Sequence, residues 1–215
     1  MTWRKTLEII MGYRLQITDI AKHFDRHLLF KNINCTVEQG QLLTISGENG
    51  SGKSTLLRII AGLLTPSQGS IGYYQDSQAI DAVRLRTQVG MAAPACNLYD
   101  ELTAYENLLF LARLRGNIQP HDKIESLLEF MGLLKFRHEP YGIFSTGMKQ
   151  RLKIAAAVLD EPAFLLLDEP FSNLDSKGRE IVAHLIDEQR TRGCVIIASN
   201  IKDDIDRGDV RIELS

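Results

Sequence analysis

The chain has 215 residues, of which 44% are hydrophobic and 24% charged, a composition typical of a globular protein with one large domain or two small ones. Its net charge of −2 argues against a general nucleic-acid-binding protein, because such proteins usually carry a basic stripe. No stretch approaches the ~18 apolar residues that span a bilayer. The widely spaced Cys35, Cys96 and Cys194 predict buried free thiols in a reducing compartment.

The first half of the chain alternates strand-like and turn-like segments. Residues 1–12 contain one short apolar patch, too short for a secretory signal, and are interpreted as an extension or a short helix outside the core. Alternating or continuous apolar residues then predict strands over 15–20, 28–37, 42–45 and 88–92, and a helix over 54–61.

The second half begins with helical patterns. Thr103 and Glu106 can form a capping box in front of one helix, and further helices are predicted over 122–131 and from Gly147 to Leu159. The all-apolar run 164–167 is typical of a strand buried on both faces. A long amphipathic helix and two short strands follow, over 176–192, 194–198 and 210–214. This order predicts an α/β sheet with a helical lobe.

The sequence GENGSGKST, residues 47–55, fits the phosphate-binding pattern G-x-x-x-x-G-K-[ST] and lies between a predicted strand and a predicted helix, as the pattern requires. The glycines let backbone N–H groups turn toward phosphate oxygens, and the helix N-terminus adds its positive end. Lys53 is expected to neutralise the β- and γ-phosphates, and Ser54 to bind Mg²⁺. An accidental glycine-rich turn is the alternative. The predicted nucleotide contacts are Gly47, Asn49, Gly50, Ser51, Gly52, Lys53, Ser54 and Thr55.

The sequence FLLLDEP, residues 164–170, delivers two adjacent carboxylates at the end of a buried strand, which is costly unless they have a function. Asp168 is predicted to hold Mg²⁺ through water, and Glu169 to polarise the attacking water as a general base. A helix N-cap and a surface acid are the alternative. The neighbouring phosphate-binding loop favours the functional interpretation.

Two further motifs are FSTGMKQR, residues 144–151, and SNLD, residues 172–175. In this order the motifs resemble those of the ATP-binding-cassette (ABC) ATPases, whose signature loop reads Leu-Ser-Gly-Gly-Gln. The Ser-Thr-Gly-Met-Lys-Gln-Arg sequence is similar to a variant of bacterial exporter-type members. The resemblance covers most of the chain, from about Leu15 to the end. Taken alone, residues 144–151 could be a polar helix cap.

The resemblance implies an α/β fold with a P-loop NTPase core of mostly parallel sheet, an N-terminal antiparallel β part and a helical subdomain at about 96–158, within a domain spanning 13–215. It implies ATP and Mg²⁺ as cofactors and ATP hydrolysis. It also implies a second ATPase subunit and a separate integral membrane permease as partners, with no nucleic acid. The chain would then act in the cytoplasm, at the inner face of the cell membrane.

The resemblance also assigns site residues. By position, the resemblance assigns to Ser145 and Gly147 a contact with the γ-phosphate of ATP held by a second subunit. The physics agrees, because a hydroxyl and free N–H groups at the start of a helix form an anion site. Since the sequence has no second phosphate loop, the site would be split between two chains in a head-to-tail dimer. Asp175 is placed among the nucleotide-binding residues as well. In the family, an aromatic residue in the loop after the first strand stacks on adenine, and the resemblance places Phe24 there. A core phenylalanine is equally expected.

Two positions depart from the family's pattern. Where the family has a glutamine after the strand in VGMAA, this chain has Pro94, which cannot bind a metal through its side chain; Asn97 could substitute, at a different offset. The family's histidine after the strand in VIIASN is replaced by Asn200, which can donate a hydrogen bond to the γ-phosphate but cannot become a cation. Asn200 is therefore predicted to be a weaker catalytic sensor, with a turn asparagine as the alternative.

Three other functions stay open at this stage. Pro94 and Asn200 are compatible with a regulatory nucleotide-binding subunit that has weak or no turnover, although Glu169 argues against it. The compact ending resembles haem-exporter subunits of cytochrome c maturation. A member of the same fold that acts in DNA repair, chromosome organisation or translation usually carries a coiled-coil insert or two cassettes, and this sequence has neither.

Overall fold

The structure, a computed structural model, describes residues 12–116 and 120–215. The predicted extension therefore lies outside the described residues, apart from Gly12. Within the described ranges, no helix combines the length and the apolar character needed to cross a membrane.

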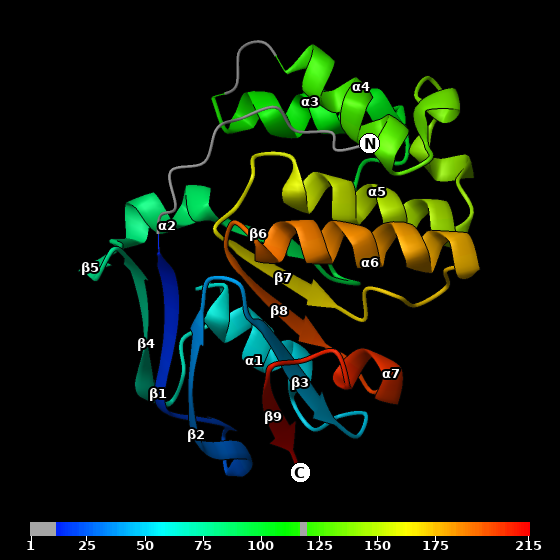
Figure 1. Ribbon diagram of the computed structural model, residues 1–215. Coiled ribbons are helices and arrows are strands. Elements are labelled where there is room, and N and C mark those ends of the chain that lie inside the picture. Colours follow the sequence, from blue (N-terminus) through cyan, green and yellow to red (C-terminus); the bar gives the residue numbers. More distant parts are fainter. Residues whose placement is uncertain (1–11, 117–119) are drawn as a thin grey trace.

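The centre of the fold is a five-stranded parallel sheet in the order β6-β7-β8-β3-β9 (Figure 1). Its strands are β3 (Leu42–Gly47), β6 (Val89–Ala92), β7 (Phe164–Asp168), β8 (Cys194–Ala198) and β9 (Val210–Leu214). Every residue of β7 and β8 is buried, as the continuous apolar runs predict. The carboxyl ends of these strands meet at one edge, where side chains from distant parts of the sequence can converge.

Successive residues of β7 contribute to two different hydrophobic clusters. Leu165 and Leu167 face the cluster that contains helices α5 (Thr146–Val158) and α6 (Ser176–Arg190). Phe164 and Leu166 face the opposite cluster, which contains α1 (Lys53–Ile60). Helix α1 lies between the parallel sheet and a second, antiparallel sheet (Figure 1). The parallel sheet is thus covered on both faces, and only its ends are open to ligands.

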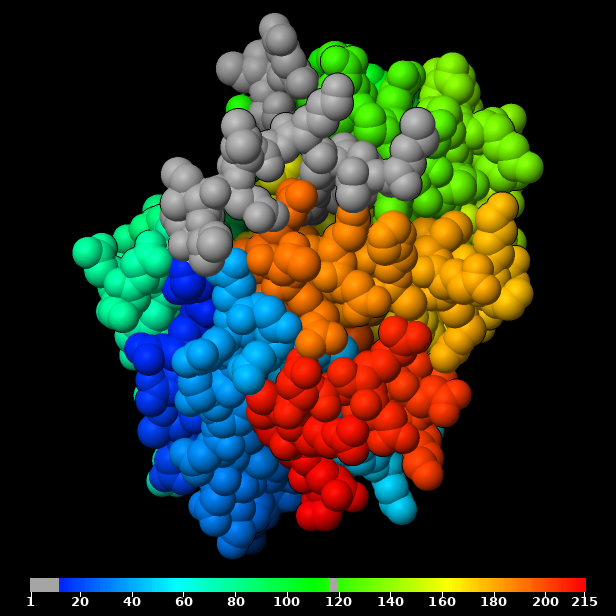
Figure 2. All heavy atoms as spheres, viewed as in Figure 1, coloured from blue at the N-terminus to red at the C-terminus, as the bar shows by residue number. Residues whose placement is uncertain are grey.

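The antiparallel sheet has the order β2-β1-β4-β5, formed by β1 (Tyr13–Phe24), β2 (His27–Glu38), β4 (Gln68–Gln75) and β5 (Gln78–Ala79). Strand β1 is longer than predicted, and register shifts interrupt its pairing. Figure 2 shows the β1–β2 hairpin beside the C-terminal segment, and β2 contacts β9. The expected combination of a parallel core and an N-terminal antiparallel part is confirmed.

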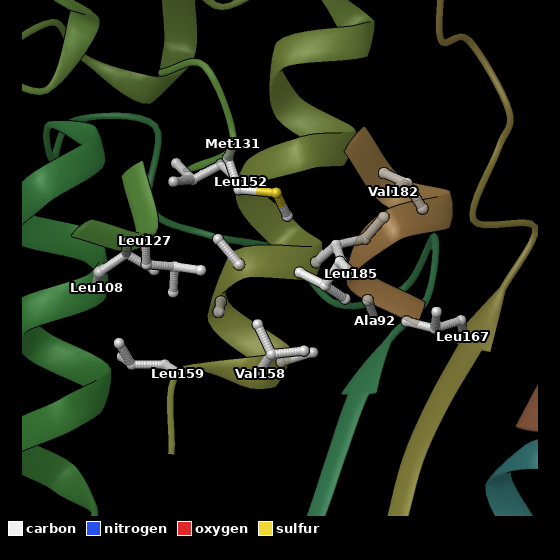
Figure 3. Packing of buried hydrophobic residues seen from close by; sticks show 14 of the residues in the cluster. Ala92, Leu108, Leu127, Met131, Leu152, Val158, Leu159, Leu167, Val182 and Leu185 are labelled. Atoms are coloured by element: carbon white, nitrogen blue, oxygen red, sulfur yellow. The ribbon is translucent and has the colours of Figure 1, made fainter. Parts of the chain in front are cut away.

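Helices cover the other face of the parallel sheet. Helices α5 and α6 lie against the sheet, and α3 (Ala104–Leu114) and α4 (His121–Phe130) pack on α5, with 3₁₀ turns at Leu134–Phe136 and Tyr141–Ile143. Figure 3 shows Leu108 and Leu127 on one side of α5 and Leu185 and Leu167 on the other, so α5 joins the outer helices to the sheet through one apolar cluster. The boundaries of a helical subdomain at about 96–158 stay a prediction.

The capping box is present at the start of α3. The Glu106 N–H donates to Thr103 Oγ1 at 3.1 Å, and the Thr103 N–H donates to Glu106 Oε2 at 2.9 Å. Together these bonds satisfy two N–H groups that a helix start would otherwise leave without partners.

Four elements were not predicted from the sequence: β4, β5, α2 (Ala82–Gln88) and α7 (Lys202–Ile205). Gly69 is the second residue of β4, and glycine lowers strand propensity. The structure requires glycine there, because φ is +84° and a Cβ atom would lie 2.3 Å from the Asp19 carbonyl oxygen. Helix α2 has no buried residue, so it lacks the apolar periodicity that predicts a helix; the Asp81 carboxylate caps it instead.

Candidate functional site

The phosphate-binding loop connects the end of β3 to the start of α1, as the sequence predicts. Gly50 and Gly52 have φ angles of +90° and +101°, a left-handed conformation that other residues rarely adopt. This conformation lets the loop turn sharply into the helix, so that the N-terminus of α1 faces the space above the loop. The loop therefore supplies the backbone N–H groups and the positive helix end of an anion-binding site.

Lys53 is the first residue of α1 and is buried, with 7% of its surface exposed. Its Nζ atom donates to the carbonyl oxygens of Gly47 and Glu48 at 2.7 and 2.9 Å. These bonds fix the ammonium group beneath the loop. Because an ammonium group has three N–H donors, it can hold the loop and a phosphate oxygen together.

A cavity of about 400 Å³ opens in front of this loop. Its lining residues come from four separate regions of the sequence, including the phosphate-binding motif and the acidic motif. Its lining residues are Phe24, Leu29, Asn49, Gly50, Gly52, Lys53, Ser54, Thr55, Pro94, Asp168 and Glu169. The phosphate-binding loop and the two carboxylates are thus brought together.

The residues of this cavity fit a magnesium nucleotide. The Ser54 hydroxyl and the Asp168 carboxylate both line it, and such oxygen donors are the ligands that Mg²⁺ prefers. The Ser51 hydroxyl, within the loop, is buried and has no hydrogen-bond partner among the described residues. A buried hydroxyl without a partner is costly, and a phosphate oxygen is a suitable acceptor for it.

Glu169 follows the last residue of β7 and has φ of +49°, a conformation that costs a non-glycine residue about 1–3 kcal/mol. Its N–H donates to the Ala198 carbonyl at 2.9 Å. The Gln150 amide on α5 donates to the carbonyl oxygens of Glu169 and Pro170, both at 3.3 Å. The backbone of Glu169 is therefore held from β8 and from α5 at once.

The Glu169 carboxylate also has partners on both oxygens. Oε1 accepts the Asn200 N–H at 3.2 Å, and Oε2 lies 3.3 Å from the Ser199 hydroxyl. Burial raises the pKa of Glu169 above its usual value of 4.5; these hydrogen bonds and the Lys53 charge lower it, and Asp168 raises it. A raised pKa brings a carboxylate closer to the value that suits a general base near neutral pH.

Asn200 contacts the phosphate-binding loop rather than the wall of the 400 Å³ cavity. Its Nδ2 atom donates to Asn49 Oδ1 at 3.3 Å. Both residues line a second hollow beside the loop, together with Gly47, Glu48 and Arg211. The strand end therefore reaches the loop, and a contact between Asn200 and a γ-phosphate stays a prediction.

Phe24 is the last residue of β1 rather than part of a loop after it. Its side chain is 49% exposed, so the alternative of a core phenylalanine is wrong. The Lys22 Nζ atom lies 4.9 Å from the centre of its ring. An exposed ring at the edge of the cavity can stack on a planar base, and this role also stays a prediction.

Ser145, Gly147 and Asp175 stand at the starts of two helices, α5 and α6. The Ser145 hydroxyl caps α5 by accepting the Met148 N–H at 3.3 Å, and the Asp175 carboxylate caps α6 by accepting the Gly178 N–H at 2.8 Å. Gly147 is the second residue of α5. Within the described ranges, none of the three lines the 400 Å³ cavity. Their part in binding a nucleotide stays a prediction.

Pro94 occupies the position where the resemblance implies a glutamine. It lines the 400 Å³ cavity and a neighbouring one of about 640 Å³, which Asn97 also lines. The Lys153 ammonium on α5 donates to the Pro94 carbonyl at 3.3 Å. The backbone of this loop is thus tied to α5, although the proline side chain offers no ligand.

Sequence reasoning missed two further groups around Glu169. Gln150 lies inside the FSTGMKQR motif, but its spacing from Glu169 gives no signal of contact. Ser199 and Asp204 connect Glu169 to Arg179 through side-chain hydrogen bonds. Ser199 could have been found by the logic applied to Asn200, since both are polar residues that follow an apolar strand.

The parallel sheet, its phosphate-binding loop and the paired carboxylates define a P-loop nucleotide-binding protein. The sequence profile of the family "ABC transporter" matches residues 30–172. The chain belongs to this family, and it is an ATP-binding subunit of an ABC transporter.

Curated relatives share most of this chain. The cytochrome c biogenesis ATP-binding export protein CcmA of Nitrosococcus oceani is 37% identical over 187 residues, which cover 86% of this chain and 84% of that protein. The bacitracin transport ATP-binding protein BcrA of Enterococcus faecalis is 32% identical over 93% of this chain, but the match spans 65% of BcrA.

Solved structures share the fold. An ATP-binding subunit of an ABC transporter superposes with a TM-score of 0.82 at 27% identity, covering 93% of this chain and 85% of that one. The ATP-binding cassette MJ0796, solved as a dimer in a post-hydrolysis state with ADP and Pi, superposes with a TM-score of 0.79 at 27% identity, covering 94% of each chain.

Proposed function

We propose that this chain binds Mg-ATP, dimerises around two nucleotides and hydrolyses them to drive a separate membrane permease. The observation that carries the proposal is the single cavity that Lys53, Ser54, Asp168 and Glu169 line together. Phosphoryl transfer to water depends on positioning and on charge neutralisation, and these four side chains supply both.

Each side chain has a defined part in this proposal. Lys53 neutralises the β- and γ-phosphates, while the loop N–H groups orient them. Ser54 and Asp168 would hold Mg²⁺, which neutralises phosphate charge when it is bound. Glu169 accepts a proton from the attacking water, and its carboxylate is held in place from the end of β8.

The positions of Ser145 and Gly147 support a site shared between two chains. They stand at the N-terminus of α5, which is an anion-binding position, yet they do not line the cavity of their own chain in the described structure. A head-to-tail dimer would place them over the loop of the partner subunit. The dimeric structure of MJ0796 with ADP and Pi supports this arrangement.

The permease is proposed because ATP-binding subunits of ABC transporters act on a membrane component. Export is the proposed direction, supported by the resemblance of residues 144–151 to exporter-type signature loops. The relative CcmA is named as an export protein of cytochrome c biogenesis, and this name supports that pathway as an alternative assignment.

A regulatory subunit with weak or no turnover is the second candidate. It is favoured by the proline at position 94, which gives the cavity no side-chain ligand where the resemblance implies a glutamine. The retained and buried Glu169 favours hydrolysis instead.

Phosphate release separates the two candidates. The purified chain should release phosphate from Mg-ATP, and Glu169→Gln should abolish this release while ATP binding persists, because the amide cannot accept the proton. Equal rates for the wild type and Glu169→Gln would favour the regulatory candidate. Affinity capture of the chain from membranes, followed by mass spectrometry, identifies the permease and with it the direction of transport.

A further inference from the structure

The two oxygens of the Glu169 carboxylate are held by two consecutive residues at the end of β8. Oε1 accepts the backbone N–H of Asn200, which any residue at that position would provide. Oε2 contacts the side-chain hydroxyl of Ser199, which depends on the amino acid. The orientation of the general base therefore depends on how Ser199 itself is held.

Ser199 is buried, with 1% of its surface exposed. Its Oγ atom accepts the Ile201 N–H at 3.1 Å and lies 2.9 Å from Asp204 Oδ2 and 3.3 Å from Glu169 Oε2. A hydroxyl carries one proton, so it can donate to one of these carboxylates at a time. The hydroxyl oxygen nevertheless lies within hydrogen-bond distance of both, closer to Asp204.

Asp204, on α7, is also 1% exposed, and a buried carboxylate is costly without a charged partner. The Arg179 Nη2 atom donates to its Oδ1 at 3.1 Å. Arg179 is itself fixed, because Nη1 donates to the Phe171 carbonyl at 3.3 Å and its guanidinium lies 5.0 Å from the Phe171 ring centre. The chain of contacts thus runs from α6 through Asp204 and Ser199 to Glu169.

We infer that Ser199 and Asp204 are positioning residues, which hold the Glu169 carboxylate toward the nucleotide cavity. The Ile201 N–H and Asp204 hold the Ser199 oxygen in place, and Arg179 balances the charge of Asp204. From that position the Ser199 hydroxyl can turn its one proton to Oε2 of the base. The inference rests on the proposed function, because it assigns these residues to the general base of ATP hydrolysis. Residues that orient a reacting group through hydrogen bonds typically change activity by about 10–100-fold when they are removed.

The test is steady-state ATP hydrolysis by the purified chain with Mg-ATP. Ser199→Ala should lower kcat by about 10–100-fold and leave the KM for ATP and the Kd for ADP within about twofold, because the phosphate loop is untouched. Ser199→Thr keeps the hydroxyl and should retain most of the activity. Asp204→Ala should slow hydrolysis in the same way, whereas Asp203→Ala, which removes an exposed carboxylate from the same helix, should not.

A double variant shows whether Ser199 acts through Glu169. Two residues that act as one unit have non-additive effects, so Ser199→Ala added to Glu169→Gln should leave the residual single-turnover rate unchanged. The inference is overturned if Ser199→Ala keeps kcat within twofold of the wild type, or if it slows Glu169→Gln by the same factor as the wild type. A wild-type chain that releases no phosphate overturns the proposed function itself, and this inference with it.

Discussion

The side-chain amide of Asn200 donates a hydrogen bond of 3.3 Å to the side-chain oxygen of Asn49. This bond joins the end of β8 to the phosphate-binding loop, across 151 positions of the sequence. The same residue holds Glu169 through its backbone N–H. Asn200 is therefore placed between the loop and Glu169, the proposed general base.

The first prediction concerns this placement. Asn200→Ala removes the amide donor, so ATP turnover should fall, by up to about 10²–10³-fold if the amide reaches the transferring phosphoryl group, while the affinity for ADP hardly changes. Asn200→His restores the histidine that the family has at this position and could raise turnover. Both Asn200 variants should be assayed with and without Pro94→Gln, because the missing glutamine at position 94 complicates the comparison. Wild-type turnover of Asn200→Ala in both backgrounds would show that Asn200 is only a turn residue.

The second prediction concerns Lys53. Lys53→Ala should weaken Mg-ATP binding at least tenfold, since a hydrogen bond to a charged group contributes about 1.5–3 kcal/mol. Calorimetric titration measures the affinity, and circular dichroism checks that the fold survives. Arg58→Ala is the matched control, because it removes an exposed cation from the same helix. An unchanged affinity of Lys53→Ala would contradict the assignment of residues 47–55.

The third prediction concerns Phe24. If its exposed ring stacks on adenine, Phe24→Ala should weaken ADP binding by about 2–13-fold, equivalent to the ~0.5–1.5 kcal/mol of an aromatic pair, and Phe24→Trp should retain it. Leu28→Ala, at a similarly exposed position of the same hairpin, should leave affinity unchanged. Equal affinities for the wild type and Phe24→Ala would exclude stacking.

The fourth prediction follows from the raised pKa of Glu169. The folded chain holds this proton more tightly than the unfolded chain, so the contribution of Glu169 to stability is greatest below pH 4.5 and is lost as pH rises through the folded pKa. Without nucleotide, Glu169→Gln should therefore gain stability relative to the wild type as pH rises from about 4 to 7.

Urea denaturation at several pH values measures this difference. Glu180→Gln, which makes the same chemical change at an exposed site of α6, should show no such trend. A stability difference between Glu169→Gln and the wild type that stays constant, or reverses with pH, would contradict the prediction.

Local patterns were sufficient to predict the elements of the parallel sheet and its phosphate loop. The run 164–167 is apolar because β7 is buried on both faces, and the loop glycines are required by its backbone. Strand β4 was not predicted because it contains Gly69. A glycine is needed there only because the backbone of the paired strand β1 lies so close, and this contact cannot be seen in the sequence. Helix α2 was not predicted because none of its residues is buried, so its sequence shows no apolar periodicity.

The sequence was sufficient to predict the site residues that lie at the ends of strands. Asp168 ends one apolar strand and Glu169 and Asn200 follow apolar strands, and parallel strands end at one edge. The link from Glu169 through Ser199 and Asp204 to Arg179 depends on how α6 and α7 lie against that edge, and no spacing in the sequence records this. The exposure of Phe24 likewise depends on the hairpin it ends.

The fifth prediction tests the central claim, that ATP is bound and hydrolysed between two copies of this chain. Glu169→Gln keeps the shape of the site but removes the base, so ATP should persist and hold two chains together. Light scattering in saturating Mg-ATP should show a dimer that dissociates when Mg²⁺ is chelated, and adding Ser145→Arg should prevent it. A monomer under saturating Mg-ATP, with Ser145→Arg making no difference, would contradict the shared site.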